Sequence, residues 1–197
     1  MSKTPSTIAE FRDLVRRHLS ALLIKLKNSD DDESYVFRRG DGKEGDLRNW
    51  LAARLREVGD KYYSVTREQE VSNEKRPDLR IDARDGSLGQ IPVEIKLADK
   101  DWTGITLLNK IETQLAMQYL RESDSHSGFY VLVNASHPKE DTIRKGKVIR
   151  PRFQKKIGKK SISFLELIDR AKKRAEKVTE NLPDDKIVEI CWADLSE

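Results

Sequence analysis

The sequence predicts an α/β protein, because segments with helical and strand-like hydrophobic patterns alternate along its length. The length of 197 residues fits one domain with its own hydrophobic core. Hydrophobic and charged residues each make up 37% of the chain, a composition that is polar but not typical of disorder. The expected order is helix, helix, three strands, helix, strand, helix and strand.

The individual elements follow from the spacing of the apolar residues. Helices are predicted where these residues recur every three or four positions, at 6–28, 44–58, 103–122 and 163–178. Strands are predicted where they alternate or run together, at 61–71, 78–83, 93–98, 127–135 and 186–195.

The N-terminal helix stands apart from the rest of this pattern. We divide the chain into a helix and linker, residues 1–40, and a main domain, residues 41–197. The helix at 6–28 carries arginines between its apolar positions, and we expect it to pack on its own domain or on a second copy of the chain. Contact with a membrane or with nucleic acid is the alternative.

Residues 76–96, RPDLRIDARDGSLGQIPVEIK, are the centre of the prediction. Apolar and charged residues alternate on both sides of a glycine-containing turn, which predicts a β-hairpin with one apolar and one charged face. Folding about that turn brings Asp78 opposite residues 94–96. Asp78, Glu94 and Lys96 then converge on one small patch.

Two neighbouring carboxylates repel each other unless a cation neutralises them. Mg²⁺ is bound by oxygen ligands, often one or two carboxylates with water and phosphate oxygens. Lys96 adds a donor that can orient a water or meet negative charge in a transition state. The group suits metal-assisted hydrolysis of a phosphodiester, and a buried ion-pair cluster is the structural alternative.

Two other segments, Asp41-Gly42-Lys43 and Asp184-Asp185-Lys186, have the same acid-x-lysine spacing. The first adjoins a helix start and the second follows Pro183 in a predicted turn. Only Glu94-Ile95-Lys96 lies on a strand that follows another strand beginning with an acid. This context selects residues 94–96 as the candidate site.

The pattern Pro77-Asp78 … Glu94-Ile95-Lys96 resembles the PD-(D/E)XK nuclease superfamily, over about residues 44–135. The resemblance implies a restriction-endonuclease-like core, with a central mixed β-sheet flanked by helices on both faces. It also implies that Asp78, Glu94 and the Ile95 carbonyl hold Mg²⁺, for which Mn²⁺ is expected to substitute, and that Lys96 positions the attacking water.

The resemblance also suggests further site residues. Glu44, at the start of a core helix, is expected either to support the metal site or to interact with the helix dipole. Gln114 is expected to reach the site from the helix at 103–122, and Tyr119 either does so or packs as an ordinary aromatic. These two are five residues apart rather than four, which places them on different flanks of a regular helix. Asp82 is either a further ligand or a residue that pairs with a nearby arginine or faces water.

Residues 144–160, RKGKVIRPRFQKKIGKK, are the most basic tract, and nine of the seventeen are lysine or arginine. Lysine and arginine on a mobile loop suit contact with phosphates, although a charge run is commonly a solvated surface. We expect this tract to bind DNA, with RNA not excluded, through Lys145, Lys147, Arg150, Arg152, Lys155 and Lys156.

Composition limits the partners, disulfides, metal sites and membrane segments that we expect. The net charge of +4 and the pI of about 9.0 are compatible with a polyanionic partner. Cys191 is the single cysteine, so no intramolecular disulfide forms and a zinc site fits poorly. No apolar run approaches the roughly 20 residues of a membrane span, and no signal-peptide region is present. We expect a cytoplasmic protein without a membrane partner.

These observations predict a Mg²⁺-dependent DNA endonuclease, similar to bacterial restriction or anti-phage effectors. A homodimer, formed through the helix at 6–28, or a regulatory partner protein is possible in this class. The alternative is a catalytically inactive module of the same fold that binds nucleic acid or a partner protein. Such a module would bind DNA in a salt-sensitive way without cleaving it.

Overall fold

The computed structural model describes residues 4–28, 36–37, 42–67, 76–100, 102–136, 143–144, 147–148, 153 and 155–196. Its centre is a five-stranded mixed sheet in the order β1-β2-β3-β4-β9. β1 and β2, and β2 and β3, pair antiparallel, whereas β3 and β4, and β4 and β9, pair parallel. The strands span Tyr63–Arg67 (β1), Leu79–Ala83 (β2), Gln90–Leu97 (β3), Ser127–Asn134 (β4) and Ile187–Asp194 (β9).

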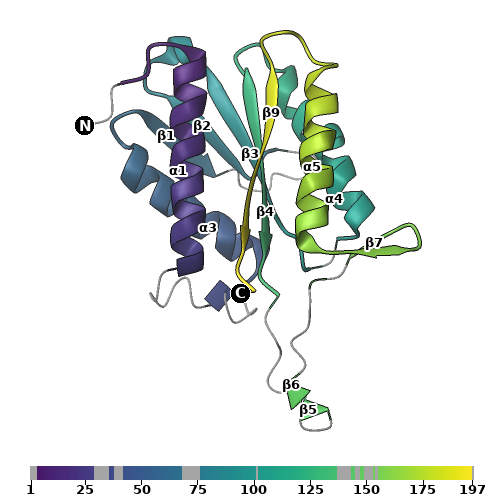
Figure 1. The fold of residues 1–197 in the computed structure, drawn as a ribbon. Helices are drawn as coiled ribbons and strands as arrows, with labels where there is room; N and C mark the ends of the chain where they lie inside the picture. Colours follow the sequence, from purple (N-terminus) through teal and green to yellow (C-terminus); the bar gives the residue numbers. More distant parts are fainter. Residues whose placement is uncertain are drawn as a thin grey trace.

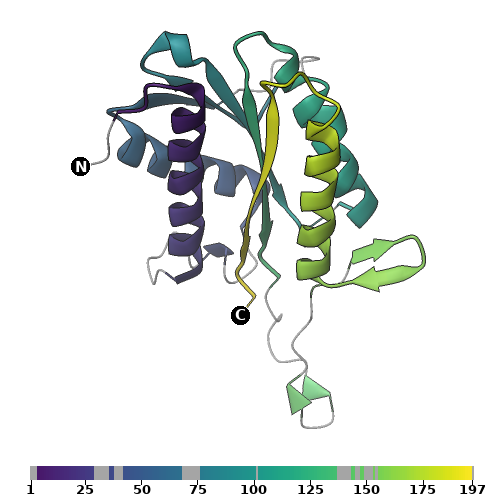
Figure 2. The same ribbon diagram turned by 45° about the horizontal axis from the view of Figure 1, so that its top comes forward.

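Helices cover both faces of this sheet, as Figures 1 and 2 show. One face carries α1 (Ile8–Asn28) and α3 (Glu44–Gly59), and the other carries α4 (Gly104–Lys110) and α5 (Phe164–Thr179). Each pair of helices encloses a separate apolar cluster against the sheet. The predicted α/β class and the mixed sheet with helices on both faces are therefore confirmed.

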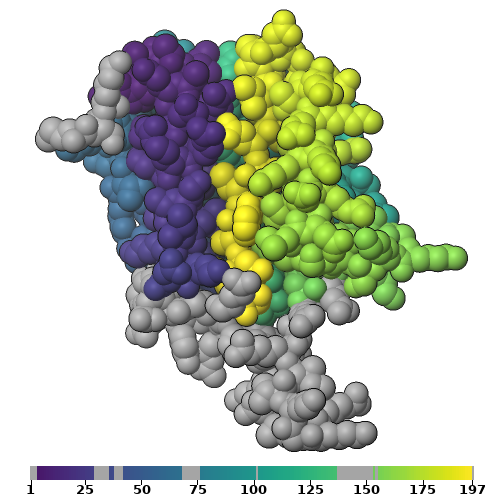
Figure 3. All heavy atoms as spheres, viewed as in Figure 1, coloured from purple at the N-terminus to yellow at the C-terminus, as the bar shows by residue number. Residues whose placement is uncertain are grey.

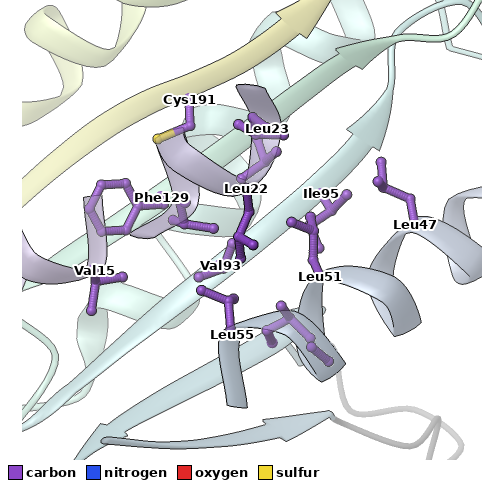
Figure 4. Packing of buried hydrophobic residues seen from close by; sticks show 14 of the residues in the cluster. Val15, Leu22, Leu23, Leu47, Leu51, Leu55, Val93, Ile95, Phe129 and Cys191 are labelled. Atoms are coloured by element: carbon purple, nitrogen blue, oxygen red, sulfur yellow. The ribbon is translucent and has the colours of Figure 1, made fainter. Parts of the chain in front are cut away.

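The first cluster shows why the helical spacing in the sequence was informative. Leu22 of α1 and Leu51 of α3 point at Val93, Phe129 and Cys191 on three strands (Figure 4). The helix α1 thus packs on its own domain, which was one of the two expected partners. The predicted boundary after residue 40 lies outside the described residues.

The β2–β3 hairpin forms around the predicted glycine turn. A short 3-10 helix, Gly86–Leu88, joins the strands, and Gly89 follows it with φ of 71°. A Cβ on Gly89 would lie 2.1 Å from the Asp124 carbonyl oxygen, so this position requires glycine. Leu79 pairs with Val93 in the hairpin, which brings Asp78 to the level of the next β3 residue.

The single helix predicted for residues 103–122 is wrong. The helix α4 ends at Lys110 and is followed by a π-helix, Ile111–Ala116, and a 3-10 helix, Tyr119–Arg121. The Met117 amide donates to the Glu112 carbonyl at 2.9 Å, five residues back. The Thr113 hydroxyl donates to the Asn109 carbonyl at 3.0 Å, a side-chain bond of the kind that bends helices. The 3.6-residue spacing therefore does not apply between Gln114 and Tyr119.

The basic tract, which the sequence predicts to be a loop, contains short strands. Its described parts pair as two small hairpins, one of β5 and β6 and one of β7 and β8. They span Ile143–Arg144 (β5), Lys147–Val148 (β6), Lys155–Ile157 (β7) and Lys160–Ile162 (β8).

The strand β9 forms one edge of the main sheet, and its surface is visible between α1 and α5 in Figure 3. Within the described residues, no helix combines the length and hydrophobicity that a membrane crossing needs.

Candidate active site

The site forms where β3 continues beyond the end of β2. In the described part of the chain, the pairing of β2 with β3 ends at Val93. The next β3 amides on that side donate instead to carboxylates: Ile95 N–H to Asp78 Oδ2 at 2.8 Å, and Leu97 N–H to Glu44 Oε2 at 3.4 Å. Two acidic side chains thus replace a missing strand partner, and these bonds fix their orientation.

Lys96 lies at the centre of these acids. Its Nζ lies 2.8 Å from Glu94 Oε1, 2.9 Å from Glu44 Oε1 and 3.5 Å from Asp78 Oδ2. It also donates to the Ile95 carbonyl at 2.8 Å. The convergence of Asp78, Glu94 and Lys96 predicted from the hairpin is confirmed, and Glu44 joins them from α3.

The two central charges are buried, with Glu94 3% and Lys96 4% exposed. Burial and then the nearby Asp78 carboxylate raise the pKa of Glu94 to about 7, although Lys96 opposes both. Burial alone would lower the pKa of Lys96, but Glu94, Asp78 and Glu44 outweigh it and the net shift is upward. Lys96 is therefore an ammonium at neutral pH, and Glu94 exchanges its proton near neutrality.

This burial corrects one expectation from the sequence. The sequence predicts one apolar and one charged face for β3, but all eight residues of β3 are buried. Glu94 lies beside Tyr130 of β4, and the layer of α4 and α5 covers this face. The helix α4 follows β3 closely, but α5 lies far along the chain, and the local alternation of β3 contains no information about how either helix packs on it.

The oxygen atoms around Lys96 are a chemically suitable set for Mg²⁺. Oxygens of Asp78, Glu94 and Ile95 all lie within 3.5 Å of the same nitrogen atom. Carboxylate and carbonyl oxygens are the donors that this hard cation prefers. Among the described residues, no group of three His, Cys, Asp or Glu side chains is arranged to hold a metal ion.

Sequence reasoning missed Arg48. Its Nη1 lies 3.2 Å from Asp78 Oδ1, while the other oxygen of Asp78 faces Ile95 and Lys96. Arg48 follows Glu44 by four residues in α3, and residues at this spacing share one helix face. That spacing was a usable signal, because it places a cation beside the one acid already assigned to the helix.

Sequence reasoning also missed Trp102 and Lys110. The Trp102 Nε1–H donates to Glu44 Oε2 at 3.3 Å, and Lys110 Nζ lies 4.2 Å from the centroid of the Trp102 ring. Lys110 in turn donates to Gln114 Oε1 at 2.9 Å. Gln114 is thus connected to the site through Lys110, and its side chain is half-buried. Lys110 precedes Gln114 by four residues, so the same helical spacing was a usable signal, although its contact with Trp102 depends on the packing of α4.

The two remaining candidates have clear partners. Tyr119 is buried in the α4–α5 cluster, and its hydroxyl donates to the Arg76 carbonyl at 2.8 Å. It is a packed aromatic that also holds the backbone two residues before Asp78. Asp82 pairs with Arg80 at 3.1 Å, which confirms the arginine alternative.

The structure describes only some of the predicted nucleic-acid contacts. Lys155 donates to the Lys100 carbonyl, just past the end of β3, and Lys156 is exposed. Lys147 is described in its backbone alone, as part of β6. The other predicted residues, Lys145, Arg150 and Arg152, lie outside the described part of the chain.

Comparison with protein-family models, with curated proteins and with solved structures gave no significant match.

Proposed function

We propose that this protein is a Mg²⁺-dependent DNA endonuclease with a restriction-endonuclease-like core. The observation that carries the proposal is the environment of Lys96 Nζ. Oxygens from three carboxylates and the Ile95 carbonyl lie within 3.5 Å of this one atom. Ion pairs buried in this way are a poor source of stability, which favours a chemical role for the group.

The order of elements supports the proposed fold. From α3 to β4 the chain runs helix, three strands, helix and strand, which is the order of a restriction-endonuclease-like core. Asp78 immediately precedes β2 and Glu94 lies on β3, which supports the proposed core. The broken helix after β3 is a departure from the regular element that we expected.

Each group at the site has a distinct role in the proposed reaction. Asp78, Glu94 and the Ile95 carbonyl would hold Mg²⁺, which supplies charge neutralisation and a water of lowered pKa when bound. Lys96 donates to the attacking water and meets the negative charge that develops on the phosphate. Its raised pKa keeps it protonated for this task. Glu44 accepts from Lys96 and orients it.

The proposed substrate is DNA, and the proposed setting is a bacterial restriction or anti-phage system. The basic tract at 144–160 supports a polyanionic substrate. Its described end adjoins the site, because Lys155 contacts the backbone just after β3.

The decisive experiment is plasmid nicking in Mg²⁺ and in Mn²⁺ by the wild-type protein and by Asp78→Asn, Glu94→Gln and Lys96→Ala. Asp82→Asn is the matched control, because Asp82 is an acid of the same hairpin that pairs with Arg80 on the surface. We expect each site variant to lose about 100-fold or more in rate, and the control to cut normally. Circular dichroism shows whether each variant is folded.

Equal nicking by all the site variants would rule the site out. DNA binding that weakens with salt, without cleavage by the wild-type protein in either metal, would identify the inactive nuclease-fold module instead. Light scattering of the full chain at several concentrations tests the homodimer separately.

A further inference from the structure

Lys110 is a second ammonium group beside the carboxylates, and its immediate partners are neutral. It is the last residue of α4, and its Nζ donates to Gln114 Oε1 at 2.9 Å. The same nitrogen lies 4.2 Å from the centroid of the Trp102 ring. An amide and an aromatic face hold the ammonium in position without cancelling its charge.

Trp102 connects Lys110 to the site. Its Nε1–H donates to Glu44 at 3.3 Å, and Lys96 Nζ lies 5.8 Å from the same ring. Both lysines therefore lie against one indole ring, close to the carboxylates. Burial, and then the charge of Lys96, lower the pKa of Lys110, and the three carboxylates of the site partly oppose this shift.

The ion pairs of the site leave Lys110 without a carboxylate partner. The three acids pair with Lys96 or Arg48, and none of the ion pairs among the described residues involves Lys110. An ammonium has three donors, and Gln114 accepts from one of them. The side chain is half-buried, so an anion from solution can reach it.

We propose that Lys110 binds a phosphate oxygen of the DNA backbone and so aligns the strand with Asp78 and Glu94. This inference rests on the proposed function and adds a substrate contact to it. A phosphodiester that approaches three carboxylates is repelled by their charge. A cation whose partners are neutral is the favourable contact, and lysine acts there as a point charge.

The test uses the full chain with Lys110→Met, Lys110→Arg and Lys25→Met. Methionine keeps an apolar stem against Trp102, and arginine keeps the charge. Lys25 is an exposed lysine of α1, on the opposite face of the sheet, and gives a matched loss of charge. Binding of a labelled DNA duplex is followed by fluorescence anisotropy in EDTA at several salt concentrations, and nicking kinetics are measured in Mg²⁺.

We expect Lys110→Met to reduce the slope of log K against log salt by about 0.9 and to weaken binding about tenfold near 0.1 M salt. In nicking, KM should rise with little change in kcat. Lys110→Arg should restore most of the salt slope and of the wild-type KM, and Lys25→Met should behave as the wild type.

An unchanged salt slope and KM in Lys110→Met, with normal wild-type nicking, overturns this inference alone. A loss of stability in Lys110→Met that Lys110→Arg does not restore also overturns this inference, because it shows that Lys110 acts by packing on Trp102. A wild-type protein that binds DNA without cutting overturns the proposed catalysis, while the slope still decides the phosphate contact. Absence of both binding and nicking overturns both proposals.

Discussion

Two acid-x-lysine segments with the same spacing occupy opposite ends of the sheet, and their lysines are both buried. Lys96, at the end of β3, is 4% exposed, and Lys186, just before β9, is 9% exposed. The partners of the two ammonium groups differ completely. Lys96 is surrounded by carboxylates, whereas Lys186 donates to the backbone carbonyls of Leu120 and Glu122.

The neutral partners of Lys186 give it a structural role. Its bonds join the 3-10 helix before β4 to the start of β9. The acid of this segment, Asp184, is exposed, and the residue between it and the lysine, Asp185, is also exposed and lies 2.7 Å from His126 Nδ1. A buried lysine is therefore a candidate catalytic residue when ionised side chains surround it. When backbone carbonyls accept its hydrogen bonds, its role is structural.

The largest expected contrast comes from replacing each lysine by methionine. Lys96→Met removes the shared cation of three carboxylates, so we expect a stability loss of about 3–5 kcal/mol. Nicking should fall about 100-fold or more. Urea unfolding at pH 8 measures the first effect, and plasmid nicking by folded protein measures the second. A stable variant that still cuts would remove the basis of the comparison.

Lys186→Met should be milder and confined to stability. The Leu120 and Glu122 carbonyls each lose a donor, which we expect to cost about 2 kcal/mol in the free energy of unfolding. Nicking per folded molecule should be unchanged. A loss of nicking as large as that of Lys96→Met would show that the distinction between the two lysines is wrong.

The pH dependence of stability sharpens the comparison further. The folded-state pKa of Glu94 is raised to about 7 from an ordinary 4.5, so its contribution to stability is complete below pH 4.5 and is lost as the pH rises through 7. Glu94→Gln mimics the protonated acid. In metal-free buffer its stability advantage over the wild type should grow from near zero at pH 4.5 to about 3 kcal/mol at pH 8. Thermal unfolding across this range measures it, and a constant difference would contradict the burial argument.

The smallest effect is expected from Tyr119→Phe. The Tyr119 hydroxyl donates to the Arg76 carbonyl, and Lys186 donates to the carbonyl of the next residue, Leu120. The 3-10 helix Tyr119–Arg121 therefore connects the segment before Asp78 with the start of β9. We expect a loss of about 1 kcal/mol for one hydrogen bond, with a few-fold slower nicking. Combining Tyr119→Phe with Lys186→Met in a double-mutant cycle measures the coupling. Strict additivity would show that the two ends are independent.

The central hairpin could be predicted from sequence because its rules are local. Two alternating runs and a glycine turn fix the register, and the register alone brings Asp78 to Glu94. The burial of Glu94 and Lys96 could not be predicted, because it depends on how α4 and α5 pack on the sheet, and α5 comes from distant sequence. The contact of Lys110 with Trp102 depends on the same packing, and the π-helix after Lys110 has no simple signature in side-chain spacing. Arg48 could have been predicted from the sequence, because it follows Glu44 by four residues on the same helix face.

The bonds from Ile95 and Leu97 to the carboxylates of Asp78 and Glu44 give the molecule a built-in spectroscopic probe. Whatever approaches those acids must alter the electron density at two peptide amides. The ¹H and ¹⁵N resonances of these two residues will therefore move on titration with a cation, without any tag, and the order in which they move will distinguish the acid that is engaged first.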